Sequence, residues 1–342
     1  MSIISIIDCT LRDGGYLNNW QFDTNFQIKT INALTRANVD IIECGFISEQ
    51  SGNDEIGTNF KSIEKVNTFL KNNGFNNTKS KFAVMMKIDE YNPDNLPPCD
   101  KIENVVSIIR VMLYKNEINQ SLDKLKKIIE KGYDLHIQPT IISHYNDEEI
   151  IEMINKFNKL NYHSISTVDT FGALHTEEIK KITRIFDKFA NKEAKLSLHC
   201  HNNLSKAYKN SIAFAESVAS NRDIYIDSSI NGLGRGAGNL QTELLITWLK
   251  TEKNMNYLVS PVKDFSLEYI QNFSRNIKEK DFYAFTITAK KNMHPNYAIW
   301  LLLQKYNRND IQKLLTKIPP EKYETFDFQY IKNLSCAYSL SR

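Results

Sequence analysis

The sequence predicts an α/β protein, a (β/α)8 TIM barrel with a helical C-terminal region. Short apolar runs rich in β-branched residues alternate with longer amphipathic stretches over roughly the first 250 residues. Eight such runs occur, which is the number of strands in this barrel. The runs are almost continuously apolar, as expected for parallel strands that helices cover. A doubly wound open sheet would usually have fewer strands and a glycine-rich first turn that opens a helix.

The predicted elements form eight successive units along the chain, and a helix follows each strand except the third. We expect strands at residues 3–10, 40–46, 81–88, 105–113, 134–142, 164–172, 195–203 and 223–232. We expect amphipathic helices at residues 26–38, 60–73, 121–132, 147–160, 176–190, 204–219 and 239–250.

The chain changes character near its C-terminal quarter. Helix-like stretches at 265–280 and 294–307 have no clear strand partners. We therefore expect a catalytic TIM-barrel domain at 1–252 and a helical C-terminal region at 253–342 that packs at the barrel mouth.

Composition excludes several classes of partner. The 43 Lys and Arg residues nearly balance 40 Asp and Glu residues, and the formal charge of +3 favours neither nucleic acid nor a membrane surface. The five cysteines are scattered and form no C-x-x-C pair, which fits a reducing compartment. The N-terminal apolar run lacks a basic flank, and no apolar run is long enough to span a bilayer. We expect a cytoplasmic protein.

Two of the seven histidines stand one residue apart in KLSLHCHNN, at the end of an apolar run. On a strand, His199 and His201 would point to the same side. They could be polar residues at an exposed strand end, or two imidazoles that converge on one metal ion. The pair alone does not decide between these interpretations.

Polar residues gather where nearly every predicted strand ends, which is the active-site face of a TIM barrel. Each has a structural interpretation as well. Arg12 and Asp13 could form a loop salt bridge, and Glu43 could be a buried acid that pairs with Arg12. Asp169 could cap the turn that follows it. Their concentration on one rim favours a functional site; in chain order the residues are Asp8, Arg12, Asp13, Glu43, Arg110, Gln138, Asp169, Thr170, His199, His201 and Asn239.

One carboxylate and two imidazoles form a partial shell for a divalent cation and leave positions open for substrate and water. An amide oxygen from Asn239 would tilt the preference toward Mg²⁺ or Mn²⁺. Arg12 supplies a second positive charge, and metal and guanidinium together would stabilise the enolate of a chelated 2-oxo acid. This set predicts carbon–carbon bond formation or cleavage without a serine or cysteine nucleophile. We expect Cys200 to point into the core.

Three segments resemble the signatures of the DRE-TIM metallolyases: DCTLRDGG at 8–15, LHCHNNLS at 198–205 and NGLGRGAGN at 231–239. That superfamily includes 4-hydroxy-2-oxovalerate aldolase, hydroxymethylglutaryl-CoA lyase, and the isopropylmalate and homocitrate synthases. The resemblance covers about residues 3–250. It implies that Asp13, His199 and His201 bind the divalent metal, Mn²⁺ or Mg²⁺, with Asn239 in or near the shell. It also implies that Arg12 stabilises the enolate and that Glu43 forms hydrogen bonds in the same pocket.

Within the superfamily, HNNLSKAYKNSIAFAES is most similar to the hydroxy-oxovalerate aldolase branch. Those aldolases carry a histidine acid or base shortly after RDG, where this chain has Tyr16. His294 could substitute for it if the C-terminal region covers the mouth, or it could simply stand at the start of a helix before Pro295. The resemblance implies a 2-oxo acid and an aldehyde as substrates, and a dehydrogenase partner or a homo-oligomer.

We therefore expect a metal-dependent carbon–carbon lyase that acts through a pyruvate enolate on an unidentified aldehyde. The alternative is a synthase that condenses an acyl-CoA with a 2-oxo acid, because the glycine-rich loop also resembles that branch. At 342 residues the chain is short for a synthase with a regulatory domain. A second alternative is a non-catalytic barrel subunit. The presence of four site-type residues argues against it: Arg12, Asp13, His199 and His201.

Overall fold

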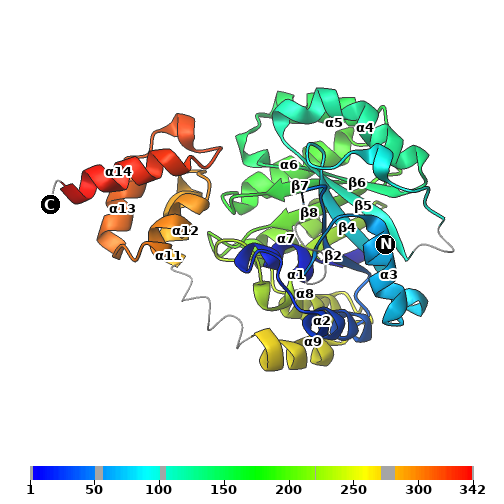
Figure 1. Cartoon of the computed structure of the whole chain (residues 1–342). Coiled ribbons are helices and arrows are strands. Elements are labelled where there is room, and N and C mark those ends of the chain that lie inside the picture. Colours follow the sequence, from blue (N-terminus) through cyan, green and yellow to red (C-terminus); the bar gives the residue numbers. More distant parts are fainter. Residues whose placement is uncertain (1–2, 51–56, 101–104, 220, 271–281, 341–342) are drawn as a thin grey trace.

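The computed structural model describes residues 3–50, 57–100, 105–219, 221–270 and 282–340 (Figure 1). Eight parallel strands close into a barrel, because the first strand pairs with both the second and the last. A short additional strand, β3, lies beside β2. The (β/α)8 TIM barrel predicted from the sequence is confirmed. Its strands are β1 Ile4–Asp8, β2 Ile41–Ile47, β3 Asn59–Phe60, β4 Lys81–Lys87, β5 Val106–Leu113, β6 Asp134–Pro139, β7 Ser164–Asp169, β8 Lys195–Cys200 and β9 Ile224–Ser228.

Helices cover the outside of the barrel, and each predicted barrel helix is present (Figure 1). One unit departs from the expected pattern, because the described residues between β4 and β5 hold only a 3-10 turn at Pro93–Asn95. A single helical turn, α1 Thr10–Asp13, directly follows β1. The barrel helices are α2 Thr24–Arg36, α3 Ile63–Asn72, α4 Ile118–Glu130, α5 Asp147–Phe157, α6 Thr176–Phe189, α7 Ala207–Ser217 and α8 Thr242–Glu252.

Helix α6 illustrates why these stretches fold as helices. Its residues Ile179, Ile182 and Phe186 are buried and recur at the spacing of one helical face. At its start, the Glu178 carboxylate accepts a hydrogen bond from the His175 backbone nitrogen at 2.7 Å. This contact belongs to a capping box, which satisfies backbone groups that the first turn leaves without partners.

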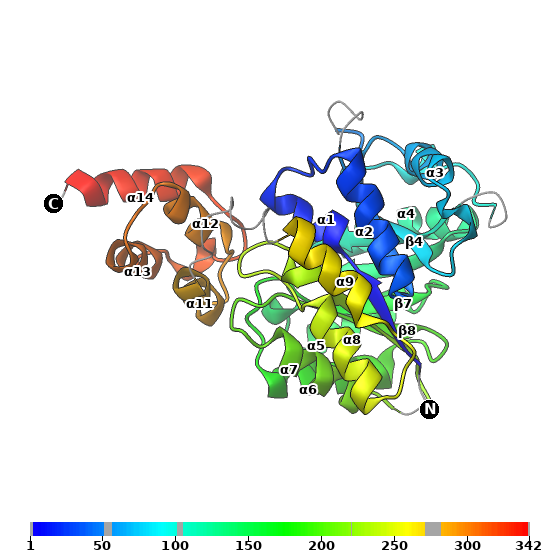
Figure 2. The same cartoon turned by 90° about the horizontal axis from the view of Figure 1, so that it is seen from below.

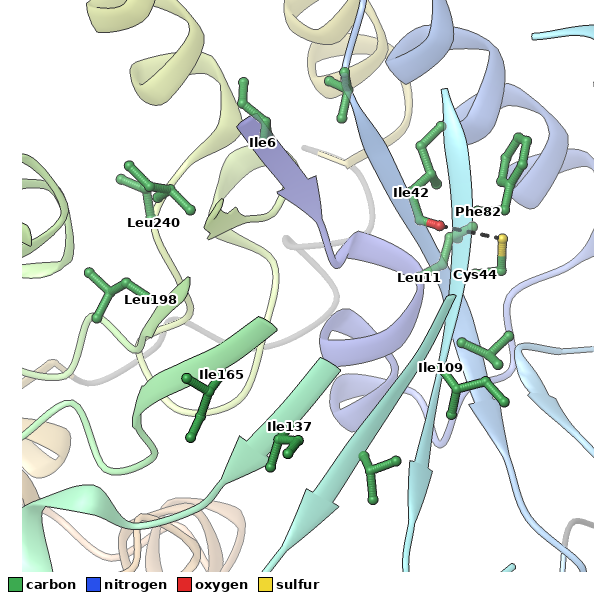
Figure 3. Close-up of a cluster of buried hydrophobic side chains, with 14 of the residues drawn as sticks. Ile6, Leu11, Ile42, Cys44, Phe82, Ile109, Ile137, Ile165, Leu198 and Leu240 are labelled. Carbon is green, nitrogen blue, oxygen red and sulfur yellow. Dashed lines mark hydrogen bonds between the residues drawn. The ribbon is translucent and has the colours of Figure 1, made fainter. Parts of the chain in front are cut away.

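Alternate strand residues face the helices and the barrel interior. Outward residues such as Ile42 and Ile109 join the apolar faces of the helices in one large buried cluster, part of which Figure 3 shows. Cys200 belongs to that cluster, as predicted. Toward the interior, a small apolar layer that includes Ile41 and Ile108 lies near the amino-terminal ends of the strands. Two residues further along three of these strands the interior becomes charged, at Glu43, Arg110 and Asp227, so the site lies toward the carboxyl-terminal mouth.

The first part of the C-terminal region packs with the barrel. Helix α9, Val259–Phe265, lies along α2, and the ring of Phe265 is 5.4 Å from the ring of Phe26 (Figure 2). A π-helical turn at Ser266–Ile270 follows, and its last residue still belongs to the barrel cluster. The remainder of the helix predicted at 265–280 lies outside the described residues.

The final helices form a second unit beside the barrel (Figure 1), with a buried cluster that Ala237 of the glycine-rich loop also joins. The predicted helical character of this region is confirmed. Asn292 joins the unit to the mouth: its side chain accepts from Ser143 Oγ at 2.7 Å, and its carbonyl oxygen lies 2.9 Å from His144 Nε2. The division of the chain at residues 252 and 253 stays a prediction. The helices are α11 Phe282–Lys290, α12 Asn296–Leu303, α13 Arg308–Thr316 and α14 Phe328–Leu340.

Two simpler expectations concern the environment of the protein. None of the helices in the described part of the chain has both the length and the apolar character needed to cross a bilayer. All five cysteines are free thiols, and three of them, Cys9, Cys44 and Cys200, are buried. The cytoplasmic location stays a prediction.

Candidate active site

Arg12 and Asp13 enter the mouth on the turn that follows β1. The carbonyl oxygen of Cys9 accepts hydrogen bonds from the backbone nitrogens of Arg12 at 3.1 Å and Asp13 at 2.8 Å, which closes the turn. Both side chains are buried, at 5% and 1% exposure, and Arg12 Nη1 donates to Asp13 Oδ1. The Arg12–Asp13 salt bridge considered from the sequence is therefore present, but inside the mouth.

The structure places Asp13, His199 and His201 together. Each offers one ligand atom, and these atoms lie within 4.8 Å of one another. The side chains are buried, with at most 5% exposure. His201 Nε2 lies 3.4 Å from Asp13 Oδ2 but forms no hydrogen bond with any described residue, so its lone pair is available. One carboxylate and two imidazoles at this spacing suit one divalent cation.

Both imidazoles are oriented by an oxygen at Nδ1. His199 Nδ1 lies 3.0 Å from Asp227 Oδ2, and His201 Nδ1 lies 3.2 Å from the carbonyl oxygen of Asp169. A carbonyl oxygen only accepts, so Nδ1 of His201 carries the proton and Nε2 keeps its lone pair. Burial lowers the pKa of His201 to about 4, which leaves the ring neutral near pH 7. A neutral imidazole that is oriented in this way is typical of a metal ligand.

Asn239 lies against the same group. It forms an isolated antiparallel bridge with His201, and its Nδ2 donates to Asp13 Oδ2 at 2.7 Å. Its Oδ1 is buried and has no hydrogen-bond partner among the described residues. An oxygen without a partner beside three ligand-type side chains fits a hard cation such as Mg²⁺ or Mn²⁺.

A chain of alternating charges links Arg12 to His199 through the barrel. Arg12 Nε donates to Glu43 Oε2 at 2.8 Å, and Arg110 Nη1 lies 3.1 Å from the same oxygen. Arg110 Nη2 donates to Asp227 Oδ2 at 2.5 Å, the oxygen that also faces His199. Buried charges persist where they are paired. This chain therefore fixes the guanidinium of Arg12 and the ring of His199 together.

Pairing keeps two of the buried acids ionised. Burial raises the pKa of Asp13, but Arg12 and His201 outweigh that effect and hold the pKa well below its usual value. Burial also raises the pKa of Asp227, and Arg110 and His199 more than offset it. Asp13 is therefore an anionic ligand-type group at neutral pH.

Two other buried acids near the mouth form no ion pair with any described residue. Burial raises the pKa of Asp8 to about 7 and that of Asp169 to about 7. Asp8 accepts hydrogen bonds from the Thr10 backbone nitrogen at 2.9 Å and from Thr242 Oγ1 at 2.7 Å. Asp169 Oδ1 accepts from the Ala173 backbone nitrogen at 2.9 Å, which is the capping role considered from the sequence.

A bulge in β2 shapes the wall next to Arg12. The register against β4 shifts between Glu43 and Phe46, and Gly45 has a φ of +146°. A β carbon at Gly45 would lie 2.0 Å from the carbonyl oxygen of Thr58, so this position requires glycine. The bulge brings the Phe46 ring to 5.9 Å from the Arg12 guanidinium, while Glu43 still faces the interior.

Tyr16 and His294, the two acid–base candidates, border the mouth from different sides. The Tyr16 ring lies 4.8 Å from the ring of Trp20, whose Nε1 donates to the Arg12 carbonyl oxygen at 2.7 Å. The His294 ring lies 5.5 Å from the ring of Phe171. Within the described residues, neither side chain forms a hydrogen bond with the three ligand-type residues.

His294 also has the structural role considered from the sequence. Its Nδ1 accepts a hydrogen bond from the Asn296 backbone nitrogen at 3.1 Å, at the start of α12. Burial lowers the pKa of His294 well below its usual value, and the charge of Arg235 lowers it further. The neutral ring then carries its proton on Nε2. His294 lines a cavity of about 690 Å³ between the loop after β5 and residues 321–326.

Sequence reasoning missed two residues of the site. Asp227 stands in an ordinary strand pattern, IYIDS, and only the pairing of β8 with β9 brings it beside His199. The alternation of that strand, which puts Asp227 on the same side as Tyr225, was the available signal. Arg235 was not singled out because it lies in the glycine-rich segment NGLGRGAGN. Its guanidinium lies 5.2 Å from the Tyr16 ring.

Comparison with known proteins agrees with this geometry. A family model described as HMGL-like matches residues 100–273, about half of the chain. Together with the closed parallel barrel and the acid, two histidines and arginine at its mouth, this match places the chain in an enzyme superfamily of lyases and synthases. The chain belongs to the HMGL-like family, within the DRE-TIM superfamily.

Curated relatives are similar at low identity. The chain is 28% identical over 253 residues to a 4-hydroxy-2-oxovalerate aldolase of Carboxydothermus hydrogenoformans, covering 72% of this chain and 70% of the relative. It is 24% identical over 265 residues to a 2-isopropylmalate synthase of Buchnera aphidicola, covering 74% of this chain and 49% of the relative. The chain thus spans about half the length of the synthases that it matches.

Solved structures share the fold. The N-terminal domain of a candidate aldolase from Bacteroides vulgatus has a TM-score of 0.74 at 22% identity, covering 90% of this chain and 99% of that one. The HMG-CoA lyase of Brucella melitensis has a TM-score of 0.60 at 17% identity, covering 80% of this chain and all of that one. These likenesses support the fold alone.

Proposed function

We propose that the chain is a divalent-metal-dependent aldolase that makes or breaks a carbon–carbon bond through the enolate of pyruvate or a related 2-oxo acid. The observation that carries the proposal is the buried group of Asp13, His199 and His201 with the Arg12 guanidinium held against it. The 4-hydroxy-2-oxovalerate aldolase relative, of which the chain covers 70%, supports the same reaction class.

The residues that would hold the metal are Asp13, through a carboxylate oxygen, and His199 and His201, through Nε2. Asn239 would add its unpartnered Oδ1. We propose Mn²⁺ or Mg²⁺, because carboxylate and amide oxygens favour hard cations. When bound, such an ion acts as a Lewis acid toward the oxygens of a chelated 2-oxo acid.

Arg12 would stabilise the negative charge on the enolate oxygen. Its Nε and Nη1 are engaged by Glu43 and Asp13, and Nη2 forms no hydrogen bond within the described residues. The guanidinium is therefore fixed in place, with one nitrogen left to donate to substrate. A donor held in position before the charge develops is the arrangement that stabilises such oxyanions.

Tyr16 and His294 are the candidates for proton transfer. Because His294 Nδ1 is engaged by the Asn296 backbone nitrogen, its Nε2–H is suited to donate to the oxygen of an aldehyde. Tyr16 lies on the Arg12 side of the mouth, where it could exchange a proton with the substrate carbon. The variants Tyr16→Phe and His294→Gln separate the two roles.

The reaction is tested by incubating the metal-loaded protein with 4-hydroxy-2-oxo acids and measuring the pyruvate released. Cleavage that requires Mn²⁺ or Mg²⁺ and falls in Arg12→Ala supports the proposal. Absence of cleavage and of the reverse addition across a series of aldehydes contradicts it.

The second candidate is condensation of an acyl-CoA with a 2-oxo acid. The observation in its favour is the set of 2-isopropylmalate synthases among the relatives, at 24–28% identity. Release of free thiol from acetyl-CoA in the presence of 2-oxo acids would identify this reaction. A non-catalytic barrel would show neither activity and would bind no metal. A dehydrogenase partner or a homo-oligomer stays a prediction.

A further inference from the structure

Arg235 stands in the middle of the glycine-rich loop, and the proposed reaction so far gives it no role. The preceding residue, Gly234, packs directly against Asp13 and Asn239. A β carbon at Gly234 would lie 2.6 Å from both Asp13 Oδ2 and Asn239 Nδ2. The next side chain along the loop therefore borders the same mouth.

The guanidinium of Arg235 lies between two groups at the rim. Its carbon is 5.2 Å from the centre of the Tyr16 ring, and its Nη2 is 3.4 Å from the carbonyl oxygen of Thr170. Thr170 directly follows Asp169, whose carbonyl oxygen orients His201. Arg235 thus follows Gly234, whose backbone lies against Asp13, and contacts Thr170, which is next to the residue that orients His201.

Arg235 has no counter-charge among the described residues. Its Nε is buried and has no hydrogen-bond partner there, and the Thr170 contact is long. Two lysines that lie nearer the outside are paired instead: Lys87 with Glu90, and Lys115 with Glu149 at 2.6 Å. A half-buried guanidinium that lacks an acid is costly unless a ligand supplies one.

We propose that Arg235 binds a carboxylate on the acceptor aldehyde, so that the acceptor class is an aldehyde carrying an acid group. This inference rests on the proposed aldolase function and names the substrate class of that site. In the addition, the pyruvate methyl carbon loses one proton to a base and forms the new bond to the aldehyde carbon. The aldehyde oxygen takes up one proton, so no further reactant is needed.

The carboxylate of pyruvate itself has other partners. A 2-oxo acid chelated at Asp13, His199 and His201 would already place its carboxylate beside the metal and Arg12. Arg235 lies at the rim, against the Tyr16 ring and the Thr170 carbonyl oxygen, whereas Arg12 contacts the ligand-type Asp13 directly. A single guanidinium matches the single negative charge of one carboxylate through two parallel hydrogen bonds, whereas a phosphate group carries a charge of about −1.5 to −2.

The test compares matched aldehydes in the addition to pyruvate by the full-length, metal-loaded protein. Succinate semialdehyde and glyoxylate carry the acid, butanal and acetaldehyde lack it, and glyceraldehyde 3-phosphate carries a phosphate. We expect a higher kcat/KM for the acid aldehydes. Arg235→Gln should raise KM for them by about ten- to a hundredfold, and change KM for the neutral aldehydes far less. Arg235→Lys should restore part of the difference.

Lys115→Gln is the matched control, because it removes one positive charge at the same mouth from a lysine that already has an acid partner. It should keep the preference for acid aldehydes. A wild-type protein that prefers neutral aldehydes, or the phosphate, overturns the proposal whatever the variants do. An equal loss for acid and neutral aldehydes in Arg235→Gln also overturns it, since that result indicates a structural role for the loop.

Exchange of the pyruvate methyl protons by the wild-type protein without any aldehyde tests the aldolase function separately. Exchange together with no preference for acid aldehydes would refute the role of Arg235 alone. Absence of exchange would refute the function on which it rests.

Discussion

The two imidazoles of the site are oriented in different ways. Asp227 holds His199 through its side chain, whereas Asp169 holds His201 through its backbone carbonyl. Only the first partner can be removed by substitution. Because Asp227 also pairs with Arg110, one carboxylate supports both a ligand-type residue and the charge chain that positions Arg12.

Replacing Asp227 should therefore weaken metal binding without removing a ligand. We expect Asp227→Asn to lower Mn²⁺ affinity by about 10- to 100-fold, as is typical when a partner of a metal-binding histidine is lost. Titration calorimetry measures this directly. Asp223→Asn, just before the opposite end of β9, is the matched control and should keep the affinity. An unchanged Mn²⁺ affinity in Asp227→Asn would show that Asp227 does not support metal binding by His199.

Substituting His199 and Arg12 should separate binding from chemistry. We expect His199→Ala to lose the metal, because it removes one of three ligand-type side chains. Arg12→Ala should retain metal and lower turnover by about 100- to 1,000-fold, the cost of removing one oxyanion donor. Elemental analysis and rate measurements distinguish the two. Full metal content and activity in His199→Ala would contradict the assignment.

The buried carboxyl of Asp8 makes stability depend on pH. Its pKa is raised by burial to about 7 from an ordinary value of 3.8, so the folded state holds its proton more tightly than the unfolded chain. The associated stability is complete below about pH 4 and is lost as the pH rises through 7, by up to about 4 kcal/mol.

Asp8→Asn should remove that loss, because an amide can hydrogen-bond to Thr10 and Thr242 without a charge. Urea unfolding between pH 4 and pH 8 should show a smaller decline in the free energy of unfolding than in the wild type. Asp169, with a pKa also near 7, keeps its own contribution in both proteins. Identical slopes would show that Asp8 is ionised at no cost in the folded state.

Asp13, His199 and His201 could be predicted as site residues from the sequence, because polar residues, including two of only seven histidines, occur where the predicted strands end. Their metal-binding roles stay predictions. It did not reveal Asp227, because an acid in an apolar strand gives no sign of its partners until the strand order is known. The structure also supports two of the plainer interpretations, the pairing of Glu43 with Arg12 and the cap formed by Asp169.

Among the elements, the loop at 231–239 controls the site most closely. It delivers Asn239 to Asp13 and keeps its own backbone against both residues at Gly234. No other residue type fits there, because a β carbon would come within 2.6 Å of both side chains.

Gly234→Ala should therefore displace the ligand-type group. We expect Mn²⁺ affinity to fall by about tenfold or more. Gly74→Ala is a suitable control: its φ of +76° favours glycine, but, unlike at Gly234, nothing lies within 4 Å of the added carbon. That variant should lose only about 1 kcal/mol of stability and no metal affinity. Equal affinities for both variants would show that the loop does not constrain the site.

All eight strands could be predicted, because buried parallel strands are nearly continuous apolar runs. Their ends could not. The strand predicted at 134–142 stops at Pro139. Ile141 and Ile142, which follow, are still buried and apolar, although Ile142 begins a 3-10 turn at Ile142–His144. Burial, and not strand pairing, determines residue type there. The bulge at Gly45 has no distinct sequence signal either.

For the whole molecule, the described residues form two main bodies of buried apolar side chains. One fills the barrel and extends into α9, and the other joins α11 to α14 and meets the barrel at Ala237. We propose that these are two folding units. The predicted boundary at 252 followed the end of the last barrel helix, and the amphipathic pattern alone could not show that Phe265 packs on Phe26.

Two units should give two unfolding transitions in calorimetry. Leu314→Ala should destabilise only the C-terminal unit, and Leu249→Ala only the barrel, each by about 2–5 kcal/mol because each side chain is fully buried. A single transition that shifts equally in both variants would show one cooperative unit.

The most direct measurement is exchange of the pyruvate methyl protons in D₂O, followed by NMR with the Mg²⁺-loaded protein. The proposed enolate predicts loss of the methyl signal that requires metal and disappears in Arg12→Ala while that variant still binds metal. A metal-loaded wild-type protein that leaves the methyl signal unchanged, or an Arg12→Ala variant that exchanges it at the wild-type rate, would contradict the proposed enolate chemistry.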